Sequence, residues 1–347
     1  MENNRMEIDL EKFLISEVLN LPFFFIIGRP RSGTTLLQTL CDAHPNIQIP
    51  PEARIIKESF YRFGQVKSWN EKRLNELFDF IRLNPKFIEW KVDENKVKSF
   101  LMKHLEVLNL KTILKVIYLA YPSVYHKKSI LILGDKNPNY SRMPEDFLEY
   151  FPEAKIIHVV RDYRDHILSM KRVKLLKGNL PLIATIWRNS QEKIFSLQLR
   201  YPERIFSYKY EDFVGNPEHY LKEMCDFLKI EYKPQMLLYS GLREQSREGN
   251  KFIANDMFHG NLFKPITSDN VNKWKEKMRD RDIRRADVFV GTWAERSGYE
   301  RVFRTHGIGN FFRVLPGYLY VYAYHLMNFF IFLVPPKYRR KIRYYFN

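Results

Sequence analysis

The sequence predicts an α/β fold in which helices flank a parallel sheet in three layers. Short apolar runs, which are typical of buried parallel strands, occur at 23–27, 130–133, 155–160 and 205–208. Helical patterns separate or follow these runs at 34–44, 145–150, 164–173, 183–199 and 217–228. Strands that alternate with helices indicate a parallel sheet with helices on both faces.

A glycine-bounded loop joins the first strand to the first helix. The strand at 23–27 ends at Gly28, the loop closes at Gly33, and the following helix carries leucines on one face. Such a loop presents backbone N–H groups to an anion at the positive end of a helix. We therefore expect a P-loop-type fold with a phosphate site at this position.

The loop differs from that of a nucleotide triphosphatase. Gly28 and Gly33 have the Walker A spacing, but Thr34 and Thr35 stand where that loop needs Lys followed by Ser or Thr. A kinase of the same fold would therefore lack its phosphate lysine. Arg31 supplies a cation inside the loop instead, and the alternative is a plain turn with solvent-facing arginines.

Residues 57–128 interrupt the alternation of strands and helices. Their charged and aromatic pattern predicts a helical insertion that covers the sheet. Its aromatic residues are either an apolar ligand surface or ordinary core, and they are Phe60, Tyr61, Phe63, Trp69, Phe87, Trp90, Tyr118, Tyr121 and Tyr125.

The C-terminal end has a composition of its own. Residues 301–347 contain eight Lys or Arg and no Asp or Glu, which is nearly half of the formal net charge of +17. An uncharged, tyrosine-rich stretch at 314–336 precedes the basic cluster at 337–343. We expect one domain at 1–303 and an extension at 304–347 that docks on a membrane through 314–343. The alternatives are a bilayer span, packing on its own domain, and packing on a homodimer mate.

Composition also excludes several classes. Cys41 and Cys225 are too few for a disulfide framework or a Cys-based zinc site, and no His, Asp or Glu cluster has metal-ligand spacing, so no metal is expected. The polar, acidic N-terminus is unlike a secretory signal. The sequence has no module of interleaved aromatic and basic residues, so nothing in it indicates nucleic-acid binding. A non-enzymatic membrane-binding protein is the alternative from another class, but it leaves the phosphate loop without a use.

Two motifs resemble those of the sulfotransferases that use 3′-phosphoadenosine 5′-phosphosulfate (PAPS). The run RPRSGTTLL at 29–37 resembles the family's 5′-phosphosulfate loop, and VVRDYRD at 159–165, followed by Ser169, resembles its 3′-phosphate element. Further similar segments lie at 135–138, 208–213, 264–265, 272–274 and 296–299. The resemblance covers about 21–303. It implies an enzyme that moves a sulfuryl group from PAPS, released as PAP, to a hydroxyl group.

The resemblance also implies roles for individual residues. The residues implied to bind PAPS are Arg31, Ser32, Gly33, Thr34, Thr35, Arg161, Ser169, Tyr210 and Lys273. Among them Arg161 and Ser169 would hold the 3′-phosphate, and Arg31 would stabilise charge on the bridging oxygen and 5′-phosphate. Lys136 is expected at the sulfuryl group. The alternatives are that Tyr210 is core and that Lys136 is a surface lysine.

The segments DAHP at 42–45 and PEAR at 51–54 are nearest to the tyrosylprotein sulfotransferase branch of the family. This resemblance makes Glu52 the general base, with Arg54 orienting or neutralising it. The alternative is that Glu52 only forms an ion pair, in which case the base is a histidine of the insertion, His104 or His126.

The acceptor is less well defined by the sequence. The insertion at 57–128, as a cover of the acceptor site, and the apolar extension favour a lipid or steroid-like alcohol. Protein tyrosine and carbohydrate are the alternatives. The animal enzymes of the tyrosylprotein branch work in a secretory lumen behind an N-terminal anchor, which this N-terminus lacks. We therefore expect a cytoplasmic enzyme associated with the cytoplasmic face of a membrane.

Overall fold

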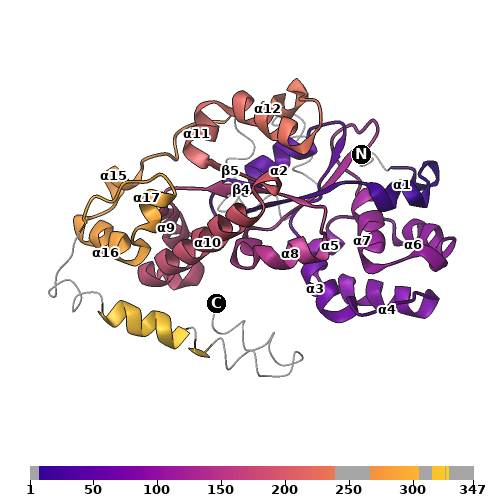
Figure 1. Cartoon of the computed structure of the whole chain (residues 1–347), viewed down its shortest axis with the longest axis horizontal. Helices are drawn as coiled ribbons and strands as arrows, with labels where there is room; N and C mark the ends of the chain where they lie inside the picture. Colours follow the sequence, from indigo (N-terminus) through magenta and orange to yellow (C-terminus); the bar gives the residue numbers. More distant parts are fainter. Residues whose placement is uncertain (1–7, 239–265, 305–314, 325, 328–347) are drawn as a thin grey trace.

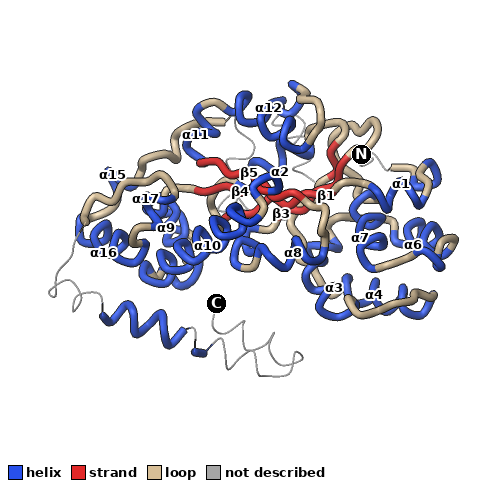
Figure 2. Tube along the Cα trace, in the orientation of Figure 1, coloured by secondary structure: helices blue, strands red, loops and turns tan. Residues whose placement is uncertain are grey.

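A single parallel sheet lies at the centre of the molecule (Figure 1). The computed structural model describes residues 8–238, 266–304, 315–324 and 326–327. Within them the strands are β1 (Phe23–Gly28), β2 (Ile47–Gln48), β3 (Ile132–Lys136), β4 (Lys155–Val160) and β5 (Ile205–Lys209). Their order is β2-β3-β1-β4-β5, and every neighbouring pair is parallel. Figure 2 shows helices on both sides of the strands, which confirms the predicted α/β class.

The described helices follow the predicted alternation with strands. They are α1 (Ile15–Asn20), α2 (Thr34–Asp42), α3 (Ile55–Phe63), α4 (Glu71–Arg82), α5 (Pro85–Ile88), α6 (Glu94–Met102), α7 (Leu110–Leu119), α8 (Pro144–Tyr150), α9 (Tyr163–Arg172), α10 (Leu180–Arg200), α11 (Tyr210–Gly215), α12 (Pro217–Leu228), α15 (Trp274–Lys277), α16 (Asp280–Val290) and α17 (Trp293–Arg296). A short 3₁₀ helix, η3 (Pro138–Arg142), follows β3.

The position of β1 in the middle of the sheet explains why its sequence is an unbroken apolar run. Phe23 and Phe25 pack in a core cluster with the insertion and α8, whereas Phe24 and Ile26 pack in a second cluster with α2 and α12. Successive side chains of a strand point to opposite faces, so a strand covered on both faces needs apolar residues at every position.

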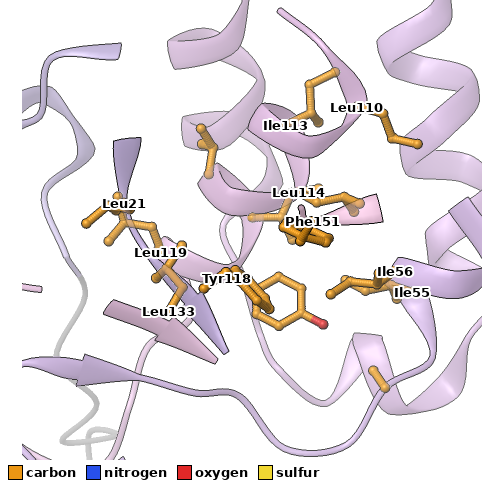
Figure 3. Close-up of a cluster of buried hydrophobic side chains, with 14 of the residues drawn as sticks. Leu21, Ile55, Ile56, Leu110, Ile113, Leu114, Tyr118, Leu119, Leu133 and Phe151 are labelled. Carbon is orange, nitrogen blue, oxygen red and sulfur yellow. The ribbon is translucent and has the colours of Figure 1, made fainter. Parts of the chain in front are cut away.

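The insertion packs its apolar residues against the sheet as core. Figure 3 shows Ile113 and Tyr118 of α7 together with Leu133 of β3 and Ile55 of α3. Most of the predicted aromatic residues are buried, namely Phe63, Trp69, Phe87, Trp90, Tyr118, Tyr121 and Tyr125, while Tyr61 is exposed. The core interpretation is therefore confirmed for these buried residues.

Two strands differ from the sequence prediction. β3 begins two residues later than predicted and ends at Lys136, so this lysine belongs to the strand and not to the loop after it. Gly134 makes the pairing with β1 possible, because a Cβ there would lie 2.6 Å from ring atoms of Phe24. β2 was not predicted, because two residues give no periodic pattern.

Part of the C-terminal extension packs on the domain. Residues 315–324 are helical, Val321 is buried in a cluster with Leu182 and Ile186 of α10, and the Tyr318 ring lies 4.6 Å from Phe289. Leu319 and Tyr322, by contrast, are 62% and 69% exposed. Within the described part of the chain, no helix is both long and apolar enough to cross a bilayer. The basic cluster at 337–343 lies outside the described residues.

Candidate active site

The loop between β1 and α2 bends sharply at two residues. Arg31 and Gly33 have φ values of 72° and 88°, in the left-handed region. A Cβ on Gly33 would lie 2.5 Å from Cδ2 of Tyr210, so only glycine allows the loop to approach this ring. Helix α2 begins directly afterwards at Thr34, and the first N–H groups of a helix have no partner within it. The loop therefore offers free backbone donors to an anion.

Gly33→Ala is expected to weaken PAP binding by at least about tenfold and to lower the free energy of unfolding by about 1–3 kcal/mol. The new methyl group meets the Tyr210 ring, and alanine is strained at a φ of 88°. Calorimetric titration with PAP and thermal melting measure the two effects. Gly215→Ala is the matched control, because a Cβ at Gly215 meets no atom within 4 Å. Equal PAP affinity in both variants would contradict the assignment of the loop.

Arginines converge beside the loop. Nε of Arg31 donates to Oγ of Ser169 at 3.2 Å, and Nη1 of Arg161 donates to the backbone oxygen of Arg31 at 2.7 Å. The Arg161 guanidinium lies 4.8 Å from the centre of the Tyr210 ring. Burial, together with the like charges of Arg172 and Arg161, lowers the pKa of Arg31 to about 10. Crowded like charges favour a ligand that carries several negative charges.

The structure thus places Arg31 with Ser169 and Arg161, the pair implied for the 3′-phosphate. Tyr210 is 8% exposed and contributes to the core cluster around α2, so it serves both as packing and as the surface between Gly33 and Arg161.

A C-terminal segment lies over this group. Nη2 of Arg161 donates to the backbone oxygen of Asn270 at 2.6 Å, and Nζ of Lys273 donates to the side chain of Asn270 at 3.0 Å. The backbone N–H of Trp274 donates to Asp165 of α9 at 2.8 Å. Lys273 and Arg161 therefore both contact Asn270. Asn270 and Arg172 were not identified from the sequence, because neither stands in a recognisable motif.

The second part of the site is a carboxylate between two lysines. Oε2 of Glu52 lies 3.1 Å from Nζ of Lys136, and Oε1 lies 3.0 Å from Nζ of Lys86. Lys136 also donates to Oγ1 of Thr35 in the phosphate loop, at 3.3 Å. Burial alone raises the pKa of Glu52, but the charges of Lys136 and Lys86 outweigh it and lower this pKa to about 2. Burial lowers the pKa of Lys136, and Glu52 offsets part of that effect.

The cation pairs of Glu52 differ from those expected. Arg54 is exposed at the start of α3, and the described ion pairs of Glu52 are with Lys136 and Lys86. Lys86 comes from the insertion, 34 residues after Glu52, and no local sequence signal marks it. Of the candidate histidines, His104 packs against Phe100, and His126 is exposed.

Buried polar atoms without partners test the fit of PAPS to this site. Oγ of Ser32 and Nε of Arg161 are buried and have no hydrogen-bond partner in the described part of the chain. Unpartnered buried donors cost free energy, which an anionic ligand can offset. The loop and the arginines therefore fit a nucleotide with two phosphate groups. Among the described residues, no three His, Cys, Asp or Glu side chains are placed to hold a metal ion.

Comparisons with known proteins agree with this geometry. The chain is 25% identical to protein-tyrosine sulfotransferase 1 of Danio rerio over 296 residues, 81% of this chain and 73% of the relative. It is 26% identical to protein-tyrosine sulfotransferase 2 of Gallus gallus over 262 residues, 73% of this chain and 63% of the relative. The sulfotransferase domain of the curacin biosynthetic pathway has the same fold, with a TM-score of 0.52, 23% identity and coverage of 81% of this chain and 99% of that domain. The sulfotransferase domain of the Synechococcus PCC 7002 olefin synthase also has this fold, with a TM-score of 0.51 and 24% identity. The match covers 79% of this chain and 94% of that domain.

The predicted location, cytoplasmic and at the cytoplasmic face of a membrane, is wrong. The relatives are protein-tyrosine sulfotransferases, and the resemblance to that branch implies a secretory lumen. The prediction relied on the small number of cysteines and on the polar N-terminal segment. Neither property determines the compartment of a protein.

A match to a protein-family model identifies the family, and the matched range includes most of these features. The model described as "Sulfotransferase family" matches residues 22–234, which is more than half of the chain. The matched range contains the phosphate loop, Glu52, Lys136, Arg161 and Ser169. The donor of this family is PAPS. The chain is therefore an enzyme of the sulfotransferase family.

Proposed function

We propose that the chain transfers the sulfuryl group of PAPS to the phenolic hydroxyl of tyrosine in proteins. The observation that carries this proposal is the contact of Glu52 with Lys136 at 3.1 Å, beside Thr35 of the phosphate loop. It brings a proton acceptor and a cation to the end of a phosphate site. The protein-tyrosine relatives favour tyrosine over a lipid or steroid-like alcohol as the acceptor.

The reaction forms a bond between the acceptor oxygen and sulfur, breaks the bond from sulfur to the bridging oxygen, and releases the hydroxyl proton. We assign Glu52 to take up this proton. A phenol has a pKa of about 10, so a carboxylate accepts the proton only as the new oxygen–sulfur bond forms. Lys136 and Arg31 stabilise the negative charge that grows on the phosphate. Arg161, Ser169 and Lys273 hold the 3′-phosphate.

A labelled-PAPS assay over several acceptor classes tests the proposal. Tyrosine-containing peptides should be labelled, and the same peptides with phenylalanine in place of tyrosine should not. Phenols, sterols, lipid alcohols and sugars form the competing arms. Faster labelling of a sterol or a lipid alcohol than of every peptide would overturn the choice of acceptor without overturning the transfer reaction.

We further propose that the segment 314–343 contacts a lipid surface. One side of the helix at 315–324 packs on α10 and α16, while Leu319 and Tyr322 face solvent. In the sequence, the basic cluster 337–343 follows the uncharged stretch 314–336 that contains this helix. Apolar and aromatic side chains next to several cations fit a membrane interface.

The double variant Leu319→Glu, Tyr322→Glu is expected to reduce binding to phosphatidylserine vesicles by about tenfold or more, with little effect on binding of PAP. Cosedimentation with phosphatidylserine and with neutral phosphatidylcholine vesicles measures this. The matched control is Leu199→Glu, since Leu199 on α10 is also exposed. Wild-type protein that stays in the supernatant with both kinds of vesicle would contradict lipid contact.

A further inference from the structure

Glu52 is paired with a lysine from the insertion as well as with one from the sheet. Nζ of Lys86 lies 3.0 Å from Oε1 of Glu52, on the carboxylate oxygen that Lys136 does not contact. Lys86 is on α5, a short helix whose start is fixed by Asn84, which accepts a hydrogen bond from the Lys86 N–H at 3.1 Å. The two lysines therefore hold the two oxygens separately.

A buried tryptophan joins the α5 turn to the segment of Glu52. Trp90 is fully buried, and its Nε1 donates to the backbone oxygen of Pro51 at 2.9 Å. Its ring packs edge-on against Phe87 and Tyr118, at centroid distances of 5.5 and 5.0 Å. The hydrogen bond from Trp90 to Pro51 thus connects the residue before Glu52 to the segment after Lys86. It fixes the position of the α5 turn that carries Lys86.

The two lysines differ in what else they contact. Lys136 also donates to Thr35 of the phosphate loop, so an anion bound in the loop competes with Glu52 for the Lys136 ammonium. Lys86 reaches the other oxygen of the Glu52 carboxylate from the insertion. When PAPS engages Lys136, the ion pair with Lys86 still holds Oε1 of Glu52.

We propose that Lys86 is a positioning residue for sulfuryl transfer, which keeps Glu52 ionised and oriented towards the acceptor hydroxyl while Lys136 engages the donor. This inference rests on the proposed role of Glu52 as the base. It gives the insertion a part in the reaction besides packing on the sheet.

The other charged and titratable groups near Glu52 do not replace Lys86. Asp135, buried next to Lys136 on β3, has its pKa raised to about 7 by burial. Tyr140 of η3 is also buried, and its pKa is raised by burial and by the nearby acids. Arg54 is exposed, and its charge acts on Tyr140. Removal of Lys86 would leave Glu52 with a shared lysine and a buried setting that favours its protonated form.

Lys86→Met tests the proposal. We expect kcat with a tyrosine peptide to fall about ten- to a hundredfold with little change in the KM for PAPS. The acid limb of the kcat profile should move to higher pH by about one unit or more, because the pKa of Glu52 rises when a cation is lost. Lys86→Arg should restore most of the rate and the acid limb. Lys72→Met, at an exposed position on α4, is the control and should behave as wild type.

Thermal melting and calorimetric titration with PAP show whether Lys86→Met is folded and binds the nucleotide. A folded variant with the wild-type kcat and acid limb would overturn the role of Lys86. Equal losses in Lys86→Met and Lys86→Arg would also overturn it, because the charge would then not matter. Glu52→Gln separates the two proposals: if it is inactive while Lys86→Met is normal, only the role of Lys86 fails. If it is fully active, the base assignment fails, and the role of Lys86 with it.

Discussion

Glu52→Gln is expected to lower kcat by about 10²- to 10⁴-fold without weakening the binding of PAP. Glutamine keeps the shape of the side chain and an oxygen that can accept a hydrogen bond from Lys136 or Lys86, but it cannot take up the acceptor proton. The Glu52 carboxylate lies 3.1 Å from Nζ of Lys136. Loss of this charge frees Lys136 for the phosphate, so the Kd of PAP should stay equal or decrease.

The matched variants for this prediction come from the insertion. Glu106→Gln removes an exposed carboxylate on the same insertion and should keep wild-type turnover. His104→Ala and His126→Ala should keep it as well, because His104 packs on Phe100 and His126 faces solvent. Single-turnover rates at saturating PAPS measure all four variants. Normal turnover in Glu52→Gln, with loss of turnover in His126→Ala, would show that the base is a histidine.

Arg161→Met is expected to weaken PAP binding by about 30-fold or more, which corresponds to about 2 kcal/mol. Arg161 is 8% exposed, and its Nη1 and Nη2 donate to the backbone oxygens of Arg31 and Asn270. Its Nε is buried and has no partner among the described residues. Methionine removes the charge and separates the phosphate loop from the segment that carries Lys273. Both effects act on the nucleotide.

A comparison of the affinities for PAP and 5′-AMP shows which phosphate Arg161 binds. Wild type should bind PAP more tightly than 5′-AMP, which lacks the 3′-phosphate, and Arg161→Met should lose most of this preference. Arg82→Met is the control, because Arg82 forms surface ion pairs with Asp79 and Glu94 that contribute little. An unchanged ratio of the two dissociation constants in Arg161→Met would place the 3′-phosphate elsewhere.

The strand, loop and helix around residues 29–33 could be predicted from the sequence because their residues are close in the chain. The loop at 29–33 lies directly between a strand and a helix, and Arg161 lies just before α9, which contains Ser169. The boundaries were less well predicted where pairing between strands decided them. β3 extends to Lys136 because Gly134 leaves room for Phe24 of the neighbouring strand, and no local pattern shows that contact.

Composition could not separate packing from ligand contact. The aromatic residues of the insertion were compatible with an apolar acceptor surface, and burial shows that Trp90 and Tyr118 are core. In the same way, the composition of the extension was compatible with docking on a membrane and with packing on its own domain. The structure shows that Val321 packs on α10 while Leu319 is exposed.

The sequence by itself determined the fold class and the loop between the first strand and its helix, because each depends on neighbours within one strand, loop and helix. The residues that bind the nucleotide stay a prediction. The tertiary structure decided which charges meet. It brought Lys86 to Glu52 across 34 residues and Arg31 to Ser169 across 138 residues. Such contacts depend on how helices pack on the sheet, and packing is set by shape and burial over the whole domain. The cation that holds the proposed base was therefore visible only in the folded chain.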